Sequence, residues 1–259
     1  MRGRLLLSLL GALLALFGST FVIPIAAGLL LGEPREQVGW LYGLPLLLSV
    51  GGGLLLYYRF RSNDELRDRE AFALVSVAWL VFAAIGALPY AMAGELSGPD
   101  GVPLLVYDLS PVEAYFESIS GLTTTGATIF DSSVANGTTA DGYFAAPKSL
   151  LLWRSQSQWL GGMGIIVLAT VVLSRLLGGG IQVLRAEMPG TGVTRVKPQM
   201  AQTAQLLWGL YAGLTAVEVL LLRFVGGLPL YDAVCTAFSN LSTGGFSPQA
   251  ASIGAYNSG

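Results

Sequence analysis

The sequence predicts an all-α polytopic membrane protein in which a short apolar helix followed by a Thr/Gly-rich strand occurs twice. Of the 259 residues, 53% are hydrophobic and only 12% are charged, whereas soluble domains carry roughly 25% charged residues. Several charge-free windows are long enough to cross the ~30 Å hydrocarbon core of a bilayer as helices. A sixteen-residue segment also recurs, in modified form, 119 positions further along the chain.

The composition excludes several classes of function. The chain has no histidine and a single cysteine, Cys235. The chain therefore lacks the residues needed for a His/Cys zinc site, a Ser-His-Asp triad, a His-ligated haem or an internal disulfide. The net charge of -2 provides no basic field for nucleic acid. We expect no cofactor and no nucleic-acid partner, and we expect Cys235 to be a small buried hydrophobe.

Five charge-free windows predict membrane-spanning helices, because each has about the length that a tilted helix needs. They are Leu5 to Gly32, Gln37 to Tyr58, Ala71 to Gly94, Ser155 to Ser174 and Pro198 to Val217. A signal peptide is the alternative for the first window, since Arg2 and Arg4 precede it. That apolar run is longer than the core of a signal peptide and has no clear cleavage site, which favours a span.

Cationic residues segregate to alternate connections between these windows. Those on one side are Arg2, Arg4, Arg59, Arg61, Arg67, Arg69, Arg175, Arg185, Arg195 and Lys197. Because short cytoplasmic loops are enriched in Lys and Arg, this pattern predicts a cytoplasmic N-terminus. The opposite side is acidic. Either the exclusion of Lys and Arg leaves acids by default, or a negative field concentrates cations at an outer mouth.

The outer connection after the third window contains a short helix that is too short to span a membrane. Pro111 to Leu122 is expected to be helical, with Ser110 as N-cap and Glu113 as the partner in a capping box. A helix of about twelve residues rises only ~18 Å, so it would enter the membrane and stop halfway. We therefore interpret it as a re-entrant helix.

The residues that follow this helix, Thr123, Thr124, Thr125 and Gly126, continue a helix poorly. Non-helical backbone at membrane depth must be buried in protein or line a watery cavity. Such a strand would present carbonyl and hydroxyl oxygens that can replace the hydration shell of a monovalent cation. The C-terminus of the short helix would add about half a negative charge there. A Thr/Gly-rich turn explains this segment alone equally well.

The repeat favours the filter over the turn. Residues 113–128 and 232–247 align without a gap. Identities fall at Ala114/Ala233, Ser120/Ser239, Leu122/Leu241, Thr124/Thr243 and Gly126/Gly245. Repeated units at matching topological positions are how transport proteins build a path at a symmetry axis. The predicted cation-binding residues are Thr123, Thr124, Thr125, Gly126, Ser242, Thr243, Gly244 and Gly245.

These motifs resemble the Trk/Ktr/HKT superfamily of potassium transporters, and within it the membrane subunits of bacterial Trk uptake systems. Besides TTTGAT and STGGFS, residues 153–167 resemble the first inner helix of the family and residues 185–190 its following cytoplasmic stretch. The resemblance implies units of helix, pore helix, filter and helix, as in potassium channels, with four filters around one pore. It also implies potassium uptake across the bacterial inner membrane along the electrochemical gradient, a homodimer, and a cytosolic nucleotide-binding regulatory subunit.

On this pattern the chain divides into a two-span domain over residues 1–70, a first pore unit over 71–197 and a second over 198–259 that stops after its filter. Because the family surrounds its ion with four filters, we expect a fragment of a longer protein. Within this resemblance Gly126 and Gly245 favour potassium, because the sodium-selective plant members of the superfamily look to have serine in place of the glycine of the first filter. A sodium-permeable member of the same superfamily is the alternative.

Two ionisable residues, Arg154 and Glu218, lie at or within predicted spans, where charge is costly. They could pair, but both lie near helix ends, which favours structural anchoring over a role in the ion path. They are also the candidate groups for a rival interpretation, a membrane-embedded enzyme with a re-entrant polar loop. An enzyme needs a convergent acid, base or metal set, whereas the repeated residues are Thr, Ser and Gly, so we expect no enzymatic activity. Gly161, Gly162 and Gly164 are expected to permit close helix packing.

Overall fold

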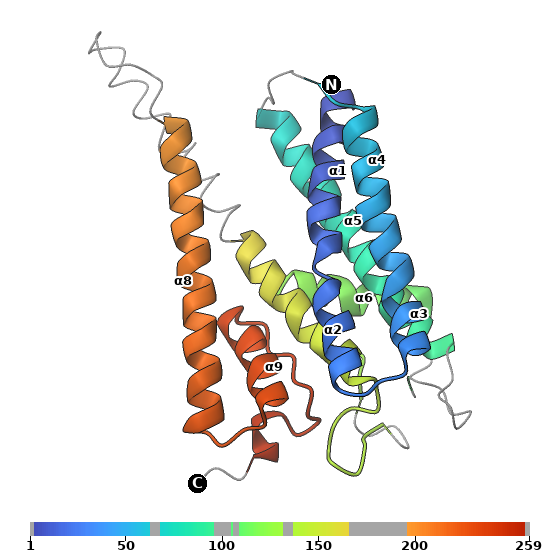
Figure 1. Ribbon diagram of the computed structural model, residues 1–259, viewed down its shortest axis with the longest axis vertical. Coiled ribbons are helices and arrows are strands. Elements are labelled where there is room, and N and C mark those ends of the chain that lie inside the picture. The colour runs from blue at the N-terminus through green and yellow to red at the C-terminus, as the bar shows by residue number, and fades with distance from the viewer. Residues whose placement is uncertain are drawn as a thin grey trace.

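The computed structural model describes residues 3–62, 68–95, 105, 109–131, 137–165 and 196–256 (Figure 1). Over these ranges the chain is helical, and its β structure consists of two isolated bridges, Thr138 with Phe144 and Tyr143 with Gln249. The predicted all-α class is confirmed for the described part of the chain.

The first two spans form a helical pair whose irregularities coincide with prolines. One span consists of α1 (Gly3–Ser19) and α2 (Val22–Leu30), and Pro24 lies four residues after the break at Thr20. A proline ring clashes with the carbonyl four residues earlier, which explains the break. The other span consists of α3 (Arg35–Leu46), the π-helical turn η1 (Leu47–Gly51) and α4 (Gly52–Arg59).

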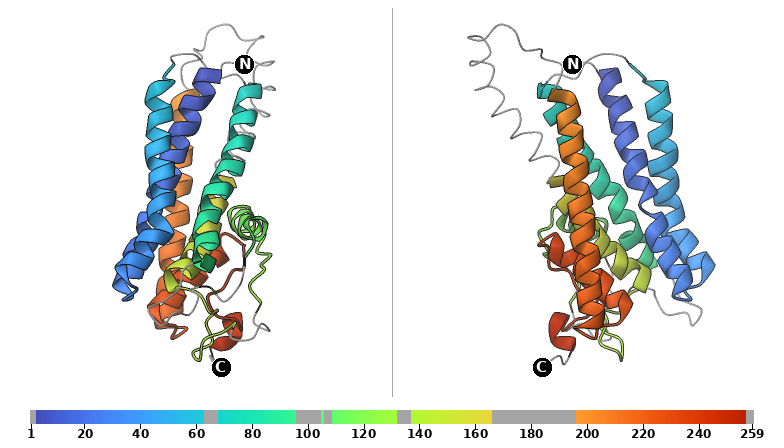
Figure 2. Two further views of the ribbon diagram at one scale, coloured as in Figure 1. Left: turned by 90° about the vertical axis from the view of Figure 1, so that its right-hand side faces the viewer. Right: turned by 60° about the vertical axis from the view of Figure 1, so that its left-hand side comes forward.

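Two tandem copies of a long helix, a short helix and a loop follow this pair. The first copy contains α5 (Asp68–Glu95) and α6 (Pro111–Leu122), and the second contains α8 (Val196–Phe224) and α9 (Leu230–Leu241). A helix over residues 148–165 lies between the copies in the sequence, and the 3-10 turn η3 (Ser252–Ala255) follows α9 and its loop. The long helices run along the same axis, and α6 and α9 lie toward one end (Figure 2).

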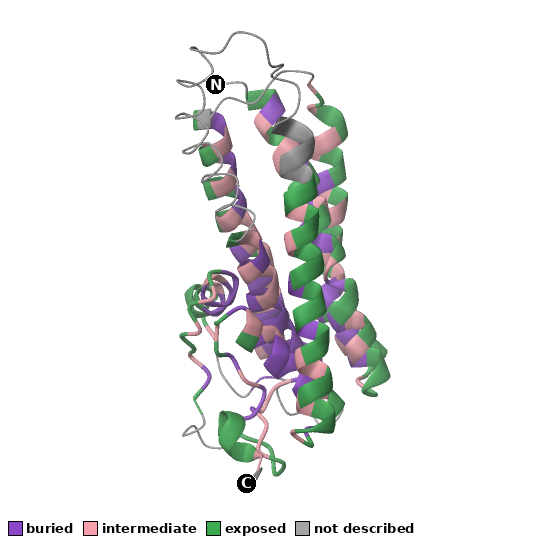
Figure 3. Cartoon of the chain, turned by 90° about the vertical axis from the view of Figure 1, so that its left-hand side faces the viewer, coloured by how far each residue is buried: buried purple, intermediate pink, exposed green. Residues whose placement is uncertain are grey.

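Four helical segments are long and apolar enough to cross a membrane: Gly3–Leu30, Arg35–Arg59, Arg69–Gly94 and Gln202–Phe224. They coincide with four of the five predicted windows. The remaining window, Ser155 to Ser174, is helical as far as residue 165. Its second half, and residues 185–190 with Arg175, Arg185 and Arg195, lie outside the described residues. Much of α8 is exposed (Figure 3), and many of its exposed residues are apolar, as expected of a helix that faces lipid tails.

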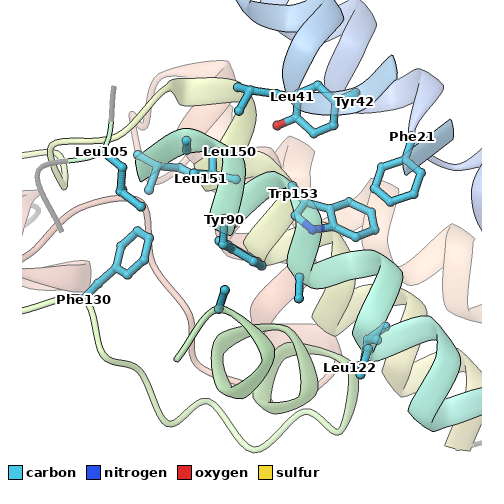
Figure 4. Close-up of a cluster of buried hydrophobic side chains, with 14 of the residues drawn as sticks. Phe21, Leu41, Tyr42, Tyr90, Leu105, Leu122, Phe130, Leu150, Leu151 and Trp153 are labelled. Carbon is cyan, nitrogen blue, oxygen red and sulfur yellow. The ribbon is translucent and has the colours of Figure 1, made fainter. Parts of the chain in front are cut away.

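The buried core joins the N-terminal pair to the first copy. Trp153 on the 148–165 helix packs its ring 4.4 Å from that of Phe21, and its indole nitrogen donates to the carbonyl of Gly86 on α5 at 3.1 Å (Figure 4). Glu33, in the connection between α2 and α3, accepts hydrogen bonds from the amide and hydroxyl of Ser149 at 2.9 and 2.6 Å. These contacts fix the 148–165 helix, which lies behind both predicted filters.

Candidate ion-filter site

The first short helix has the boundaries and the cap that the sequence predicts. The Ser110 hydroxyl accepts from the amide of Glu113 at 3.3 Å, and the Ser110 amide and hydroxyl donate to the Glu113 carboxylate at 2.9 and 2.7 Å. Hydrogen bonds from the Ser110 hydroxyl and then its amide lower the pKa of Glu113. The helix ends at Leu122, directly before the predicted filter.

The second short helix starts differently. α9 follows Pro229, and no side chain caps it. Asp232 aligns with Glu113 but is buried, and its carboxylate accepts a hydrogen bond from the Tyr143 hydroxyl at 2.9 Å. Cys235 is a free, fully buried thiol on this helix, as predicted.

The two predicted filter loops, called the first loop (residues 123–128) and the second loop (residues 242–247), share an unusual backbone. Thr124 and Thr243 have φ values of 55° and 57°, and Gly126 and Gly245 have φ values of 73° and 91°. The left-handed region is unfavourable for a β-branched residue. Two threonines in that conformation at matching positions indicate that the repeat extends to the backbone geometry.

The amides at the start of each loop point back to the end of its helix. Those of Thr123, Thr124 and Thr125 donate to carbonyls of α6 at 2.8 to 3.0 Å. Those of Thr243 and Gly244 donate to carbonyls of α9 at 2.8 and 2.9 Å. In a trans peptide the carbonyl points opposite to the next residue's amide. The carbonyls of residues 123, 124, 242 and 243 therefore point away from the helix ends.

Hydroxyl groups fasten the loops to the same helices. Thr123 Oγ1 donates to the carbonyl of Ile119 at 2.7 Å, and Ser242 Oγ lies 2.9 Å from the carbonyls of Phe238 and Ser239. A hydroxyl that donates its proton keeps its oxygen lone pairs for a cation. The C-termini of α6 and α9 add partial negative charge beside these oxygens. The two loops thus place hydroxyl and carbonyl oxygens beside the negative ends of two helices.

The loops touch each other through their backbones. A Cβ atom on Gly126 would overlap the carbonyl oxygen of Gly244. The 148–165 helix supports this contact from behind, since Gln158 Oε1 accepts from the amide of Phe246 at 3.1 Å and the side chain of Gln158 lies against Gly244. Sequence reasoning gave Gln158 no role of its own, because two buried glutamines, Gln156 and Gln158, lie on this helix and the sequence does not show which of them faces a loop.

The glycines of the 148–165 helix allow close packing, as predicted. The backbone at Gly161 lies against the carbonyl of Leu122, at Gly162 it lies beside Ser242, and at Gly164 it lies beside the ring of Trp79. Each glycine therefore brings this helix close to a different element.

The two predicted intramembrane charges do not pair with each other. Arg154 Nε lies 2.8 Å from Glu117 Oε1 on α6, and both side chains are buried. Glu218 instead accepts from Asn240 Nδ2 at 2.9 Å. Sequence reasoning missed Glu117, although a second carboxylate four residues after Glu113 on an apolar helix could have drawn attention to it. Among the described residues, no group of three His, Cys, Asp or Glu side chains could hold a metal ion.

A helical membrane protein in which two half-spanning helices end in adjoining loops has the architecture of the pore-loop class. The chain belongs to the TrkH family of cation transport proteins, whose model matches residues 45–259. It is 38% identical over 257 residues to the Trk system potassium uptake protein TrkH of Halomonas elongata, covering 98% of this chain and 48% of that protein. It is 36% identical to the Salmonella typhimurium protein of the same name, covering 100% and 49% respectively.

The fold resembles the crystal structure of the potassium transporter TrkH from Vibrio parahaemolyticus. The TM-score is 0.75 at 31% sequence identity, and the match covers 100% of this chain and 47% of that chain. The chain thus spans about half the length of the relatives that it matches.

Proposed function

We propose that this chain takes part in potassium uptake across the inner membrane of a bacterium, through a selectivity filter lined by backbone carbonyls. The observation that carries the proposal is the pair of adjoining loops with matching left-handed residues, Thr124 with Thr243 and Gly126 with Gly245. Carbonyl oxygens can replace the hydration shell of potassium without a chemical reaction. The relatives' names, which describe potassium uptake, support the same ion.

In this proposal Thr123, Thr124, Thr125, Gly126, Ser242, Thr243, Gly244 and Gly245 bind the ion. Two loops surround only part of it, and two further filter loops close the ring, in keeping with the half-length match to the relatives. An inside-negative potential supplies about 2.3 kcal/mol per charge per 100 mV. That energy drives uptake without ATP hydrolysis in this chain, and the chain is not an enzyme.

We further propose a cytoplasmic N-terminus, a homodimer and a cytosolic nucleotide-binding regulatory subunit, as in the resembling family. The orientation is supported by the distribution of charge. Arg4 in the first turn of α1, Arg59 at the end of α4 and Arg69 in the first turn of α5 lie at the end of the molecule away from α6 and α9 (Figure 1). Cytoplasmic ends are the ones enriched in Lys and Arg.

The test is growth of a potassium-uptake-deficient bacterium at low external potassium. The 259-residue chain is compared with the same chain extended by its downstream reading frame, and we expect only the extended form to rescue growth. Rescue by the short chain would contradict the four-filter arrangement. Failure of both forms, despite insertion in the membrane, would contradict potassium uptake itself.

A pair of glycine variants tests whether the preference for potassium over sodium arises at the contact between the two loops. Gly126→Ser adds atoms against the second loop, whereas Gly227→Ser adds them at a left-handed glycine with open space around it, between α8 and α9. We expect Gly126→Ser to abolish the preference for potassium over sodium and Gly227→Ser to retain it. Equal loss in both variants would show that strain alone, rather than the loop contact, is responsible.

A further inference from the structure

We propose that Arg154 is a positioning residue that locks the two loops to each other and thereby sets how sharply the filter distinguishes potassium from sodium. The proposal rests on the proposed function, since it concerns the selectivity of the same site. Arg154 lies on the 148–165 helix, and its hydrogen bonds go to Glu117 and to the last residue of each loop. These last residues follow the predicted ion-binding residues in each loop.

The guanidinium group bonds to both loops at once. Nη2 donates to the hydroxyl of Thr128, the last residue of the first loop, at 2.9 Å. Nη1 donates to the carbonyl of Ser247, the last residue of the second loop, at 3.2 Å. A planar guanidinium has five donors in a fixed fork, so it can hold two partners in a set geometry. Arg154 therefore cross-links the ends of the two loops.

A carboxylate fixes the orientation of this cross-link. Glu117 accepts from Arg154 Nε at 2.8 Å, from the Thr128 hydroxyl at 2.9 Å and from the amide of Ile129 at 3.1 Å. The side chains of Arg154 and Glu117 are only 1% and 0% exposed. Removing one partner of a buried pair leaves an uncompensated charge. Glu117 thus holds the guanidinium in one orientation and connects it to α6.

Aromatic rings from both loops enclose the guanidinium. Its carbon lies 4.3 Å from the ring centre of Phe130, which follows the first loop, and 4.3 Å from that of Phe246, in the second loop. The ring of Phe144 lies 5.4 Å away. Such cation–π contacts strengthen when the cation is desolvated. The second loop therefore contributes a hydrogen-bond acceptor and a ring to the cation, and the first loop contributes an acceptor with a ring two residues beyond its end.

A comparison of the two copies indicates that the single cross-link through Arg154 holds both loops. At the alignment offset of 119 residues, Glu117 corresponds to Thr236 and Thr128 to Ser247. The second copy thus has no carboxylate where the first has Glu117, and both loops bond to one cation on the helix between the copies. An anchor that served only the first copy would have no reason to bond to the carbonyl of Ser247.

The cross-link at Arg154 affects selectivity because the positions of the filter oxygens decide which ion they can coordinate in place of water. Discrimination between potassium and sodium depends on the number, spacing and field strength of the coordinating carbonyls. The loops otherwise meet at the backbone contact between Gly126 and Gly244. A cross-link at the loop ends prevents one strand from sliding along the other, which would change that spacing.

The test uses the full-length transporter that contains these residues, reconstituted in vesicles of phosphatidylethanolamine and phosphatidylglycerol. Initial fluxes of potassium and sodium are measured for the wild type, Arg154→Lys and Glu117→Gln. Lysine keeps the charge opposite Glu117 but lacks the fork that reaches both loops. We expect potassium flux to persist in Arg154→Lys while the potassium-to-sodium ratio falls about tenfold, the size of effect that loss of one charge-assisted hydrogen bond produces. Glu117→Gln should lower the ratio in the same direction.

The matched control is Trp153→Phe. This neighbouring residue is equally buried on the same helix, but its hydrogen bond goes to Gly86 in the core. We expect Trp153→Phe to lower the melting temperature without changing the ratio. An unchanged ratio in Arg154→Lys, or an equal fall in Trp153→Phe, would overturn the proposal. A wild type that carries no potassium would instead contradict the proposed function, so the two failures can be told apart.

Discussion

The two loops share one backbone conformation but are held in it by different means. The first loop follows a capped helix and is fastened by Glu117 on that helix. The second follows an uncapped helix, and its supports, Gln158 at Phe246 and Arg154 at Ser247, come from the 148–165 helix between the copies. The repeat has thus kept the backbone that would face an ion, while the side chains behind it have diverged.

This difference has a structural consequence. The 148–165 helix bonds to the first loop through Arg154, but a carboxylate of the first loop's own helix, Glu117, also holds that loop. Beyond the bonds from its start to α9, the second loop is held by Gln158 and Arg154 of the 148–165 helix. Tyr143, between α6 and that helix, also bonds to Asp232 at the start of α9. The second copy therefore depends for its shape on residues that precede it in the chain, and the following variants test this dependence.

The largest expected effect comes from an alanine at each left-handed glycine. Gly126→Ala and Gly245→Ala both incur the left-handed cost of about 1–2 kcal/mol. Only the Cβ at residue 126 overlaps the other loop, because Gly245 has open space around it. Overpacking adds about 1–3 kcal/mol. We expect Gly126→Ala to lower the melting temperature of the protein in detergent clearly more than Gly245→Ala does. Equal shifts would contradict the close contact between the loops.

A smaller effect is expected when the second loop loses its amide acceptor. Gln158→Leu leaves the buried amide of Phe246 without Oε1, which costs about 1–3 kcal/mol. Hydrogen exchange should then accelerate at Phe246 while the amides of the first loop stay protected. Gln156→Leu is the control, since Gln156 is equally buried but donates to the carbonyl of Thr20. Faster exchange at Phe246 in the control would show that the helix as a whole, and not Gln158, protects the second loop.

The contact between Tyr143 and Asp232 should matter less, because Tyr143 is only partly buried. Tyr143→Phe removes a hydrogen bond to a carboxylate and should cost about 1.5 kcal/mol in the free energy of unfolding, the lower end of the range for such bonds. Tyr231→Phe, which removes a bond to the neutral carbonyl of Lys148, should cost less. The reverse order would mean that the carboxylate does not govern how the second copy is attached to the first.

The smallest effect is a pH dependence confined to the first short helix. Hydrogen bonds lower the pKa of Glu113 below its ordinary value of 4.5 in the folded state. A lowered pKa contributes stability that is present above the ordinary value and is lost as the pH falls through the lowered one. Ser110→Ala should therefore destabilise the start of α6 at neutral pH, and the difference from the wild type should shrink as the pH falls below 4.5. A difference that is constant with pH would show that the carboxylate does not contribute to the cap.

Local sequence signals predict the local structure of this protein well. The capping residues Ser110 and Glu113 and the change from apolar residues to threonine place both ends of α6. Charge-free windows predict the long helices because the membrane imposes their length. The offset repeat predicts that the two loops are alike, and their φ values agree.

Contacts between distant elements could not be predicted in the same way. Arg154 pairs with Glu117 across 37 positions, and Tyr143 reaches Asp232 across 89. Hydrophobic patterning tells which face of a helix is buried, but not which neighbour packs against it. The sequence shows that Arg154 and Glu218 are costly charges in apolar helices but not which residues they contact, and only the packing of α6 against the 148–165 helix shows that Arg154 pairs with Glu117.

Thr124 and Thr243 in left-handed conformations have a further consequence. Such residues persist only where their surroundings over-determine them, and here helix-end carbonyls and the neighbouring helix do so. The energetic cost is incurred once, when the chain folds, and not again at each encounter with an ion. In the proposed filter, an arriving cation meets oxygens that are already in place, so its binding requires little reorganisation of the protein.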